Sequence, residues 1–106
     1  MITHIIKRDG RKVPFNIEKI AGAIYKAARS VGGTDYETSM KIAVDVCSLC
    51  EETLGSSSVP TVEQIQDMVE KTLMEEGHAR TAKAYILYRS DRTRAREMNT
   101  LSLIHI

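Results

Sequence analysis

IIKRDGRKVPFNIEKI, residues 5–20, is the stretch of sequence that decides the fold of this chain. Apolar and β-branched residues flank Asp9-Gly10, the strongest two-residue hairpin signal in the chain, and predict short strands at residues 2–7 and 11–15. Asn16 is a good N-cap, and apolar residues recur at helical spacing behind it. The stretch therefore predicts a β-hairpin that leads directly into a helix.

Three further helices are expected after the first one, which ends at Gly32-Gly33. The second helix is capped by Thr34 or Asp35, and the third by Thr61, where Gln64 completes a capping box. The expected ranges of these helices are residues 35–54, 61–77 and 79–98. Their connections are short, and short connections make neighbouring helices antiparallel.

Each expected helix has an apolar face that predicts its side of the core. The predicted core residues are Ile17, Ile20, Ala21, Ile24, Ala27, Ala28 and Val31, then Tyr36, Met40, Ala43, Cys47, Cys50 and Leu54, then Val62, Ile65, Val69 and Leu73, and finally Ala82, Tyr85 and Ile86. A hairpin is not stable alone and must lie on the helices. The predicted fold class is α+β, mainly α: a four-helix bundle capped by a small β-hairpin, or by a three-stranded sheet if Val59-Pro60 adds an extended piece. A cleft between hairpin and bundle is the natural place for a ligand.

The composition is that of one ordinary globular domain: 106 residues, 42% hydrophobic, 27% charged, with a formal net charge of +1. This charge gives no overall reason to bind nucleic acid, even through the basic helix at residues 89–96, or to bind an anionic membrane. No apolar run is long enough to cross a bilayer, and the charged residues 7–9 rule out a signal peptide. We expect a cytoplasmic protein.

Cys47 and Cys50 form the only C-x-x-C pair in the sequence. They fall on the apolar stripe of the second helix, so core packing is favoured over redox or metal chemistry. A structural zinc would need four ligands, and the histidines at 4, 78 and 105 show no paired spacing. No catalytic constellation, P-loop or G-x-G-x-x-G motif is present. We therefore expect no catalytic residue and no metal ligand in this chain.

The hairpin concentrates the cations Lys7, Arg8, Arg11 and Lys12, and Lys19 lies in the first turn of the helix that follows. Cations converging near the free N–H groups of a helix N-terminus are typical of a polyphosphate site. The alternative is a charged hairpin that only keeps the sheet edge soluble.

Residues 5–20 resemble the opening motif of the ATP-cone domain. The resemblance continues through TVEQIQDMVE at residues 61–70 and AKAYILYR at residues 82–89, and it covers residues 2 to about 100. It implies a helix bundle capped by a small sheet, with ATP or dATP bound between them as an allosteric effector, accompanied by Mg²⁺. The first motif is fairly specific, and the two later motifs are specific in combination.

The resemblance also implies which residues bind the nucleotide. They are Ile5, Ile6, Lys7, Arg8, Gly10, Phe15, Asn16, Lys19, Ile20, Val62, Gln66 and Arg89. The backbone of residues 5–6 would lie near adenine, the cations would meet phosphates, and the remaining side chains would line the base and sugar. Val62 stands where some relatives carry a hydroxyl, and Gln66 where some carry a histidine.

The family resemblance implies a regulatory part of a ribonucleotide reductase, not a catalyst by itself. The run SDRTRAREMN at residues 90–99 resembles the segment that joins the cone to the catalytic domain of anaerobic, glycyl-radical reductases. The expected partners are that catalytic domain and further copies of the parent. An aerobic reductase large subunit and a helical interaction domain that binds no nucleotide are the alternatives. A zinc-ribbon repressor is disfavoured because no cysteine precedes the cone.

The last six residues, LSLIHI, do not fit the polar helix before them. One back-translation, CTG TCT CTT ATA CAC ATC, resembles a transposon end used in sequencing libraries. We therefore expect the regulatory domain to span residues 1–100 and residues 101–106 to be a non-native tail. A native hydrophobic tail that packs on the bundle is the alternative.

Overall fold

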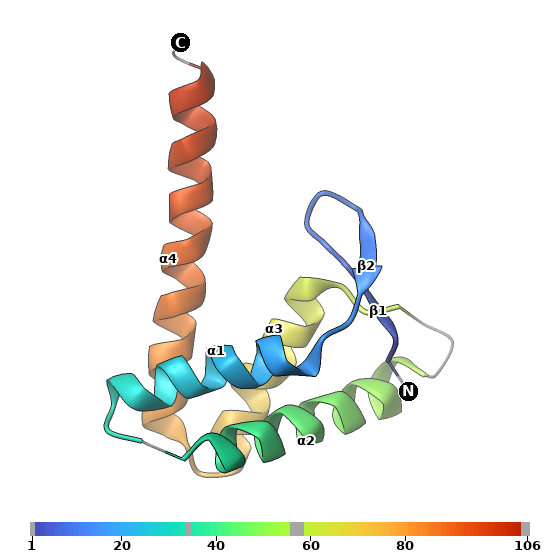
Figure 1. Ribbon diagram of the computed structural model, residues 1–106, viewed down its shortest axis with the longest axis vertical. Coiled ribbons are helices and arrows are strands. Elements are labelled where there is room, and N and C mark those ends of the chain that lie inside the picture. Colours follow the sequence, from blue (N-terminus) through green and yellow to red (C-terminus); the bar gives the residue numbers. More distant parts are fainter. Residues whose placement is uncertain (1, 34, 56–58, 105–106) are drawn as a thin grey trace.

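The computed structural model describes residues 2–33, 35–55 and 59–104, with side chains as far as Asp91. The chain forms a hairpin followed by helices (Figure 1). The elements are β1 (His4–Ile6), β2 (Lys12–Pro14), α1 (Ile17–Ser30), α2 (Tyr36–Leu54), α3 (Val62–Glu75) and α4 (Ala79–Ile104). The predicted class, α+β and mainly α, is confirmed.

The helices close into a ring in which α1 packs against α2, α2 against α3, α3 against α4, and α4 against α1. Figure 1 shows α1 and α2 side by side in opposite directions, as their short connection requires, and α4 crossing them and extending beyond the other helices. The expected tail begins inside α4, and its side chains lie outside the described part of the chain.

Three predicted helix starts are confirmed by their caps. The Asn16 and Asp35 side chains accept hydrogen bonds from the backbone N–H groups of Glu18 and Glu37, both at 2.9 Å. Thr61 and Gln64 form the predicted capping box. These caps satisfy donors that a helix N-terminus would otherwise leave unpaired.

The core lies between the helices and is built mainly from small and branched side chains. Its buried apolar residues are Ala21, Ile24, Ala27, Ile42, Ala43, Val46, Cys50, Ile65, Val69, Leu73, Ala82 and Tyr85. Burying this surface supplies the main driving force for folding, since apolar area removed from water contributes about 25 cal/mol per Å².

Two predicted core faces were partly wrong. On α2 the buried residues are Ser39, Ile42, Ala43, Val46 and Cys50, whereas Tyr36 is 41% exposed. The difference arises because α2 packs against both α1 and α3, so its buried surface is centred between them. On α4, Ala82 and Tyr85 are buried as predicted, but Ile86 is 45% exposed.

The hairpin turn also differs from the prediction. Asp9-Gly10 is not a two-residue loop: the Gly10 N–H donates to the Lys7 carbonyl at 2.9 Å, and the Lys7 N–H donates to the Arg11 carbonyl at 2.8 Å. Gly10 has φ +87°, and no other described residue of the turn has a positive φ. This is a three-residue loop that ends in a left-handed glycine, because a two-residue type I′ turn would need a positive φ at Asp9 as well.

The hairpin is attached to the start of α3. The Ile6 N–H donates to the Pro60 carbonyl at 2.9 Å, and Ile6 forms an isolated parallel bridge with Thr61. The extended piece at Val59-Pro60 therefore adds one bridge to a two-stranded sheet, and the described residues contain no third strand. Figure 1 shows the hairpin standing beside the N-terminal ends of α1 and α3.

Candidate functional site

Within the hairpin turn, Arg11 is held by Asp9. The Asp9 carboxylate accepts from the Arg11 backbone N–H at 3.1 Å and from Arg11 Nε at 2.6 Å. The backbone hydrogen bond from Arg11, together with its side-chain hydrogen bond and charge, lowers the pKa of Asp9 below its usual value. Arg11 is therefore turned toward Asp9 at the tip of the hairpin.

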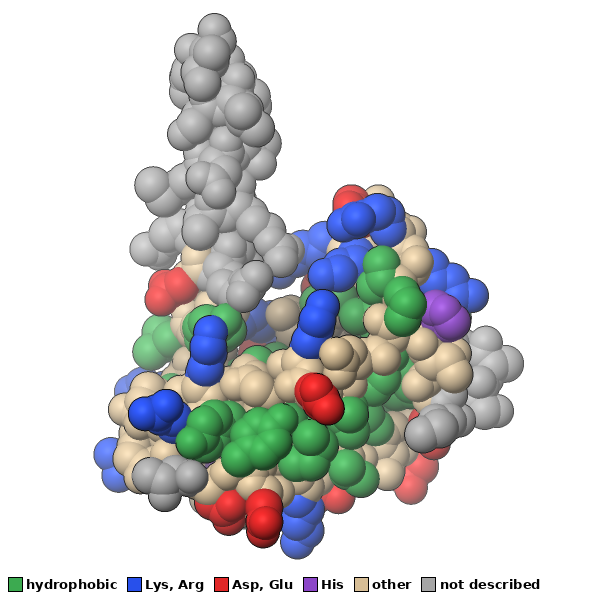
Figure 2. Space-filling view, in the orientation of Figure 1, with side chains coloured by type: hydrophobic (Ala, Val, Ile, Leu, Met, Phe, Trp, Pro, Cys, Tyr) green, Lys and Arg blue, Asp and Glu red, His purple; other side chains and the backbone are tan. Residues whose placement is uncertain are grey.

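Lys7 and Lys19 have a different environment. Lys7 is half-buried and Lys19 is exposed in the first turn of α1. Within the described part of the chain, neither ammonium group has an ion-pair partner. Figure 2 shows Lys and Arg side chains gathered on the hairpin and continuing onto the face of α1, with a hollow in the surface beside them. An anion can therefore bind these two lysines without displacing an ion-paired carboxylate of the described residues.

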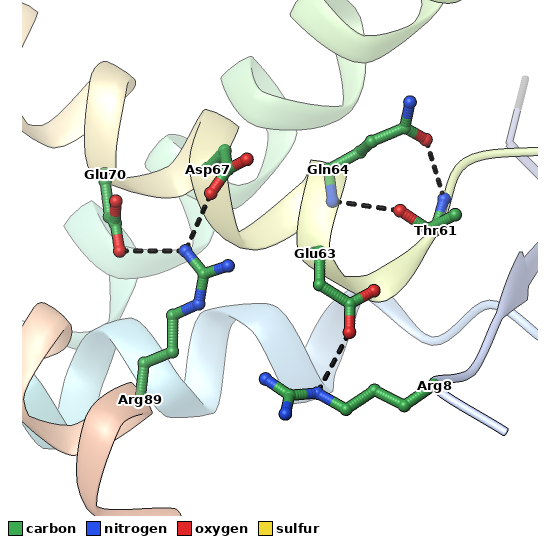
Figure 3. Close-up of polar contacts among 7 residues, drawn as sticks. All are labelled: Arg8, Thr61, Glu63, Gln64, Asp67, Glu70 and Arg89. Atoms are coloured by element: carbon green, nitrogen blue, oxygen red, sulfur yellow. Dashed lines mark hydrogen bonds and ion pairs between the residues drawn. The ribbon is translucent and has the colours of Figure 1, made fainter. Parts of the chain in front are cut away.

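Arg8 points from the hairpin to the first turn of α3. Its Nε lies 2.9 Å from Glu63 Oε1, and the two side chains are 35% and 40% exposed (Figure 3). An ion pair this exposed contributes little to stability, about 0–1 kcal/mol. Arg8 is therefore positioned by an interaction that a stronger anion can replace.

Arg89 joins α4 to α3. Its guanidinium nitrogen donates to Asp67 Oδ1 at 2.8 Å and to Glu70 Oε1 at 3.0 Å (Figure 3). Burial alone would lower the pKa of Arg89, but these hydrogen bonds outweigh burial and raise it. The Arg89 side chain is only 21% exposed, so the described structure gives it a structural role between two helices.

Gln66 lies on α3 between these two ion-pair groups in sequence. Its Oε1 is buried and has no hydrogen-bond partner among the described residues. A buried acceptor without a donor is unfavourable and is uncommon in folded proteins. Val62, one turn earlier, is half-buried. The Gln66 carbonyl oxygen can therefore accept a hydrogen bond from water or from a ligand.

The apolar members of the predicted site lie next to the cations. Ile5, Phe15 and Ile20 are half-buried and pack against the core cluster. Asn16 uses its Oδ1 to cap α1, so a contact with a ligand would fall to its amide nitrogen. The hairpin and the start of α1 thus combine apolar surface with positive charge, which an aromatic base and its phosphates require.

The sequence interpretation overlooked the acidic side of this region. Glu63, Asp67 and Glu70 hold Arg8 and Arg89, and they were not singled out from the sequence. Their spacing of four and three residues places them on one face of α3, which also carries Gln66. That spacing was the available signal, but it could not show that two arginines approach this face from other elements.

The thiols lie away from this region on α2. Cys50 is buried and Cys47 is half-buried. Burial raises the pKa of Cys47 to about 11 and also raises that of Cys50, so neither is an activated nucleophile. Within the described part of the chain, no group of three acidic, histidine or cysteine side chains could hold a metal ion. The same residues contain no helix long and apolar enough to span a bilayer.

Comparison with known proteins shows that the chain belongs to a known domain family. The profile of the ATP cone domain matches residues 3–94. The chain is 44% identical over 107 residues to the vitamin B12-dependent ribonucleoside-diphosphate reductase of Thermoplasma acidophilum, covering 95% of this chain and 13% of the relative.

Two other relatives carry different reductase names. The chain is 43% identical over 97 residues to the ribonucleoside-diphosphate reductase subunit alpha of Treponema pallidum, covering 88% of this chain and 12% of that protein. It is 39% identical over 97 residues to the anaerobic ribonucleoside-triphosphate reductase of Salmonella typhimurium, covering 92% and 13%. The chain thus spans about one eighth of the length of these relatives.

Proposed function

We propose, from the premise that this chain belongs to the ATP cone domain family, that it is the nucleotide-sensing regulatory domain of a ribonucleotide reductase. The observation that carries the proposal is the position of Lys7 and Lys19, unpaired among the described residues and next to the half-buried Ile5, Phe15 and Ile20. Positive charge beside apolar surface suits the phosphates and the base of a nucleoside triphosphate.

The nucleotide would lie between the hairpin, the start of α1 and the first turns of α3. Lys7, Lys19 and Arg8 would bind phosphates, with Gly10 giving the turn its shape. The base and sugar would lie against Ile5, Ile6, Phe15, Asn16, Ile20 and Val62. Gln66 Oε1, which has no partner among the described residues, would accept a hydrogen bond from the base or a sugar hydroxyl. Arg89 would keep α3 and α4 together and meet phosphate only if its carboxylates released it.

ATP and dATP would act as opposing effectors at this site. Each nucleotide would shift the equilibrium between two arrangements of the domain, and with it the assembly of the parent reductase. The size of that shift is limited by the difference between the nucleotide's affinities for the two arrangements. The two ligands differ by one hydroxyl, so discrimination must come from a group that contacts the sugar or from an additional bound nucleotide. Mg²⁺ would accompany the phosphates and be held mainly by them.

The parent is proposed to be an anaerobic, glycyl-radical reductase that forms homo-oligomers, with its catalytic domain as the direct partner of this one. The resemblance of residues 90–99 to the joining segment of such enzymes supports that choice. The relatives include diphosphate and vitamin B12-dependent reductases, so the large subunit of an aerobic enzyme is the competing assignment.

Isothermal titration of the chain with ATP and with dATP in Mg²⁺ tests the proposal. We expect saturable binding, weakened about 10- to 100-fold by Lys7→Ala, since hydrogen bonds to charged groups contribute about 1.5–3 kcal/mol. Lys41→Ala on α2 is the control, because it removes the same charge from an exposed position on another helix. Absence of binding by the folded chain, or equal effects of both substitutions, would contradict the proposal.

A further inference from the structure

The hairpin contacts the start of α3 through a backbone bridge and, two residues further along both segments, through an ion pair between side chains. Ile6 is bridged to Thr61, and two residues further along each segment Arg8 is paired with Glu63. Figure 3 shows Arg8 reaching across to Glu63 at the start of α3. The ion pair thus extends the attachment of the hairpin beyond its single backbone bridge.

Glu63 occupies a position that favours any anion. It lies in the first turn of α3, where the helix dipole stabilises negative charge, and it accepts a charge-assisted contact of 2.9 Å from Arg8. A phosphate placed between the hairpin and α3 would find the same two sources of stabilisation. A phosphate bound there would therefore meet Glu63 at the same guanidinium group.

We propose that Glu63 is an internal competitor of the nucleotide, which holds Arg8 and fastens the hairpin to α3 while the site is empty. The proposal rests on the proposed nucleotide-binding function. A triphosphate displaces the Glu63 carboxylate from Arg8 and thereby loosens the hairpin from α3. Glu63 is a positioning residue: it acts on the ligand through Arg8 and lowers the affinity for phosphate.

The exposure of the pair makes this exchange feasible. Both side chains are more than a third exposed, so the ion pair is weak and its replacement by a multiply charged phosphate is favourable. Arg89 differs, since its side chain is 21% exposed and two carboxylates hold it. The exchange is therefore confined to the hairpin end of α3, and the contact between α3 and α4 stays intact.

The test compares ATP affinities by isothermal titration of the whole chain and its Glu63→Gln variant. We expect Glu63→Gln to bind ATP about two- to fivefold more tightly, the range set by the strength of an exposed ion pair. Glu75→Gln at the other end of α3 is the matched control. It removes the same charge from the same helix, about 18 Å along its axis, and should change affinity by much less.

A double-mutant cycle separates competition for Arg8 from simple repulsion of phosphate. In the Arg8→Ala background the gain from Glu63→Gln should fall by at least half, because no guanidinium is left to be released. Unchanged or weaker binding by Glu63→Gln, or the same gain with and without Arg8, would overturn the inference while leaving nucleotide binding established. Absence of ATP binding by wild type and variant alike would overturn the proposed function together with the inference.

Discussion

Lys7 and Arg8 are adjacent in sequence but have different electrostatic surroundings. Among the described residues Lys7 has no ion-pair partner, whereas Arg8 is held by Glu63 at 2.9 Å. In the proposed site a phosphate would meet no ion-paired carboxylate at Lys7, whereas at Arg8 it would share the guanidinium with Glu63 or replace it. We therefore expect the two cations to have distinct roles in the proposed site, which a count of positive charges does not reveal.

Cys47 illustrates how burial suppresses chemistry at a single residue. Because burial raises the pKa of its thiol to about 11, only about one thiol in a thousand is ionised at pH 8. We expect Cys47 to react with iodoacetamide far more slowly in the native chain than in urea, with the native rate rising up to about pH 11. Mass spectrometry of the alkylated peptides measures both rates.

The raised pKa of Cys47 also predicts how the stability of the chain changes at alkaline pH. The unfolded chain loses the Cys47 proton near the ordinary pKa of 9.0, below the folded value, so the contribution of this thiol to stability falls as pH rises from about 9 to 11. A native Cys47 that reacts as fast as the unfolded one at pH 8 would contradict this account.

At the scale of the elements, two glycines differ in whether their backbone conformation requires glycine. Gly10 closes the hairpin turn with φ +87°, a conformation that costs an L-residue about 1–2 kcal/mol. Gly22 lies within α1, has no positive φ, and has open space where a Cβ would be added. Replacement by alanine should therefore destabilise the chain at one glycine and stabilise it at the other.

We expect Gly10→Ala to lower the free energy of unfolding by about 1 kcal/mol and Gly22→Ala to raise it by about 0.5–1 kcal/mol. Urea denaturation followed by circular dichroism measures both changes. Neither position has a neighbour within 4 Å of an added Cβ, so steric overlap does not obscure the comparison. Equal effects of the two substitutions would argue against the assigned turn.

The elements themselves could be predicted from the sequence because their signals are local. Asn16, Asp35 and the Thr61–Gln64 box mark helix starts whatever the chain packs against. The buried face of α2 could not be fixed in this way, since it depends on having two neighbouring helices. The turn at Gly10 was missed because Asp9-Gly10 fits both a two-residue and a three-residue loop.

The candidate site, like the fold, could be predicted only in part from the sequence. The cations of the hairpin and Lys19 follow from charge and from the family motif, which require no structure. The acidic partners of Arg8 and Arg89 depend on how the hairpin and α4 approach α3, and sequence spacing gives only the face of α3 on which they lie. The nucleotide-binding roles of these residues stay predictions.

At the scale of the whole molecule, the hairpin and the helices are held together in different ways. The helices are joined by a continuous buried core, against which Ile5 and Phe15 of the hairpin region are only half-buried. Polar contacts between the hairpin region and the helices include the Ile6–Pro60 hydrogen bond, the Arg8–Glu63 pair, and a bond of 3.0 Å from the Ile2 N–H to Glu51. The Arg89 contacts connect α3 to α4, the helix that extends beyond the others.

The most direct test of the central claim is a ¹H–¹⁵N NMR titration of the labelled chain with Mg²⁺-ATP. We predict saturable shift changes at the hairpin turn (residues 7–10), the first turn of α1 and the start of α3, including the Gln66 side-chain amide. The middle of α2, around Val46, should stay nearly unchanged. Saturable shifts centred on α2, or no shifts at ATP concentrations in large excess over the chain, would contradict a nucleotide site between the hairpin and the helices.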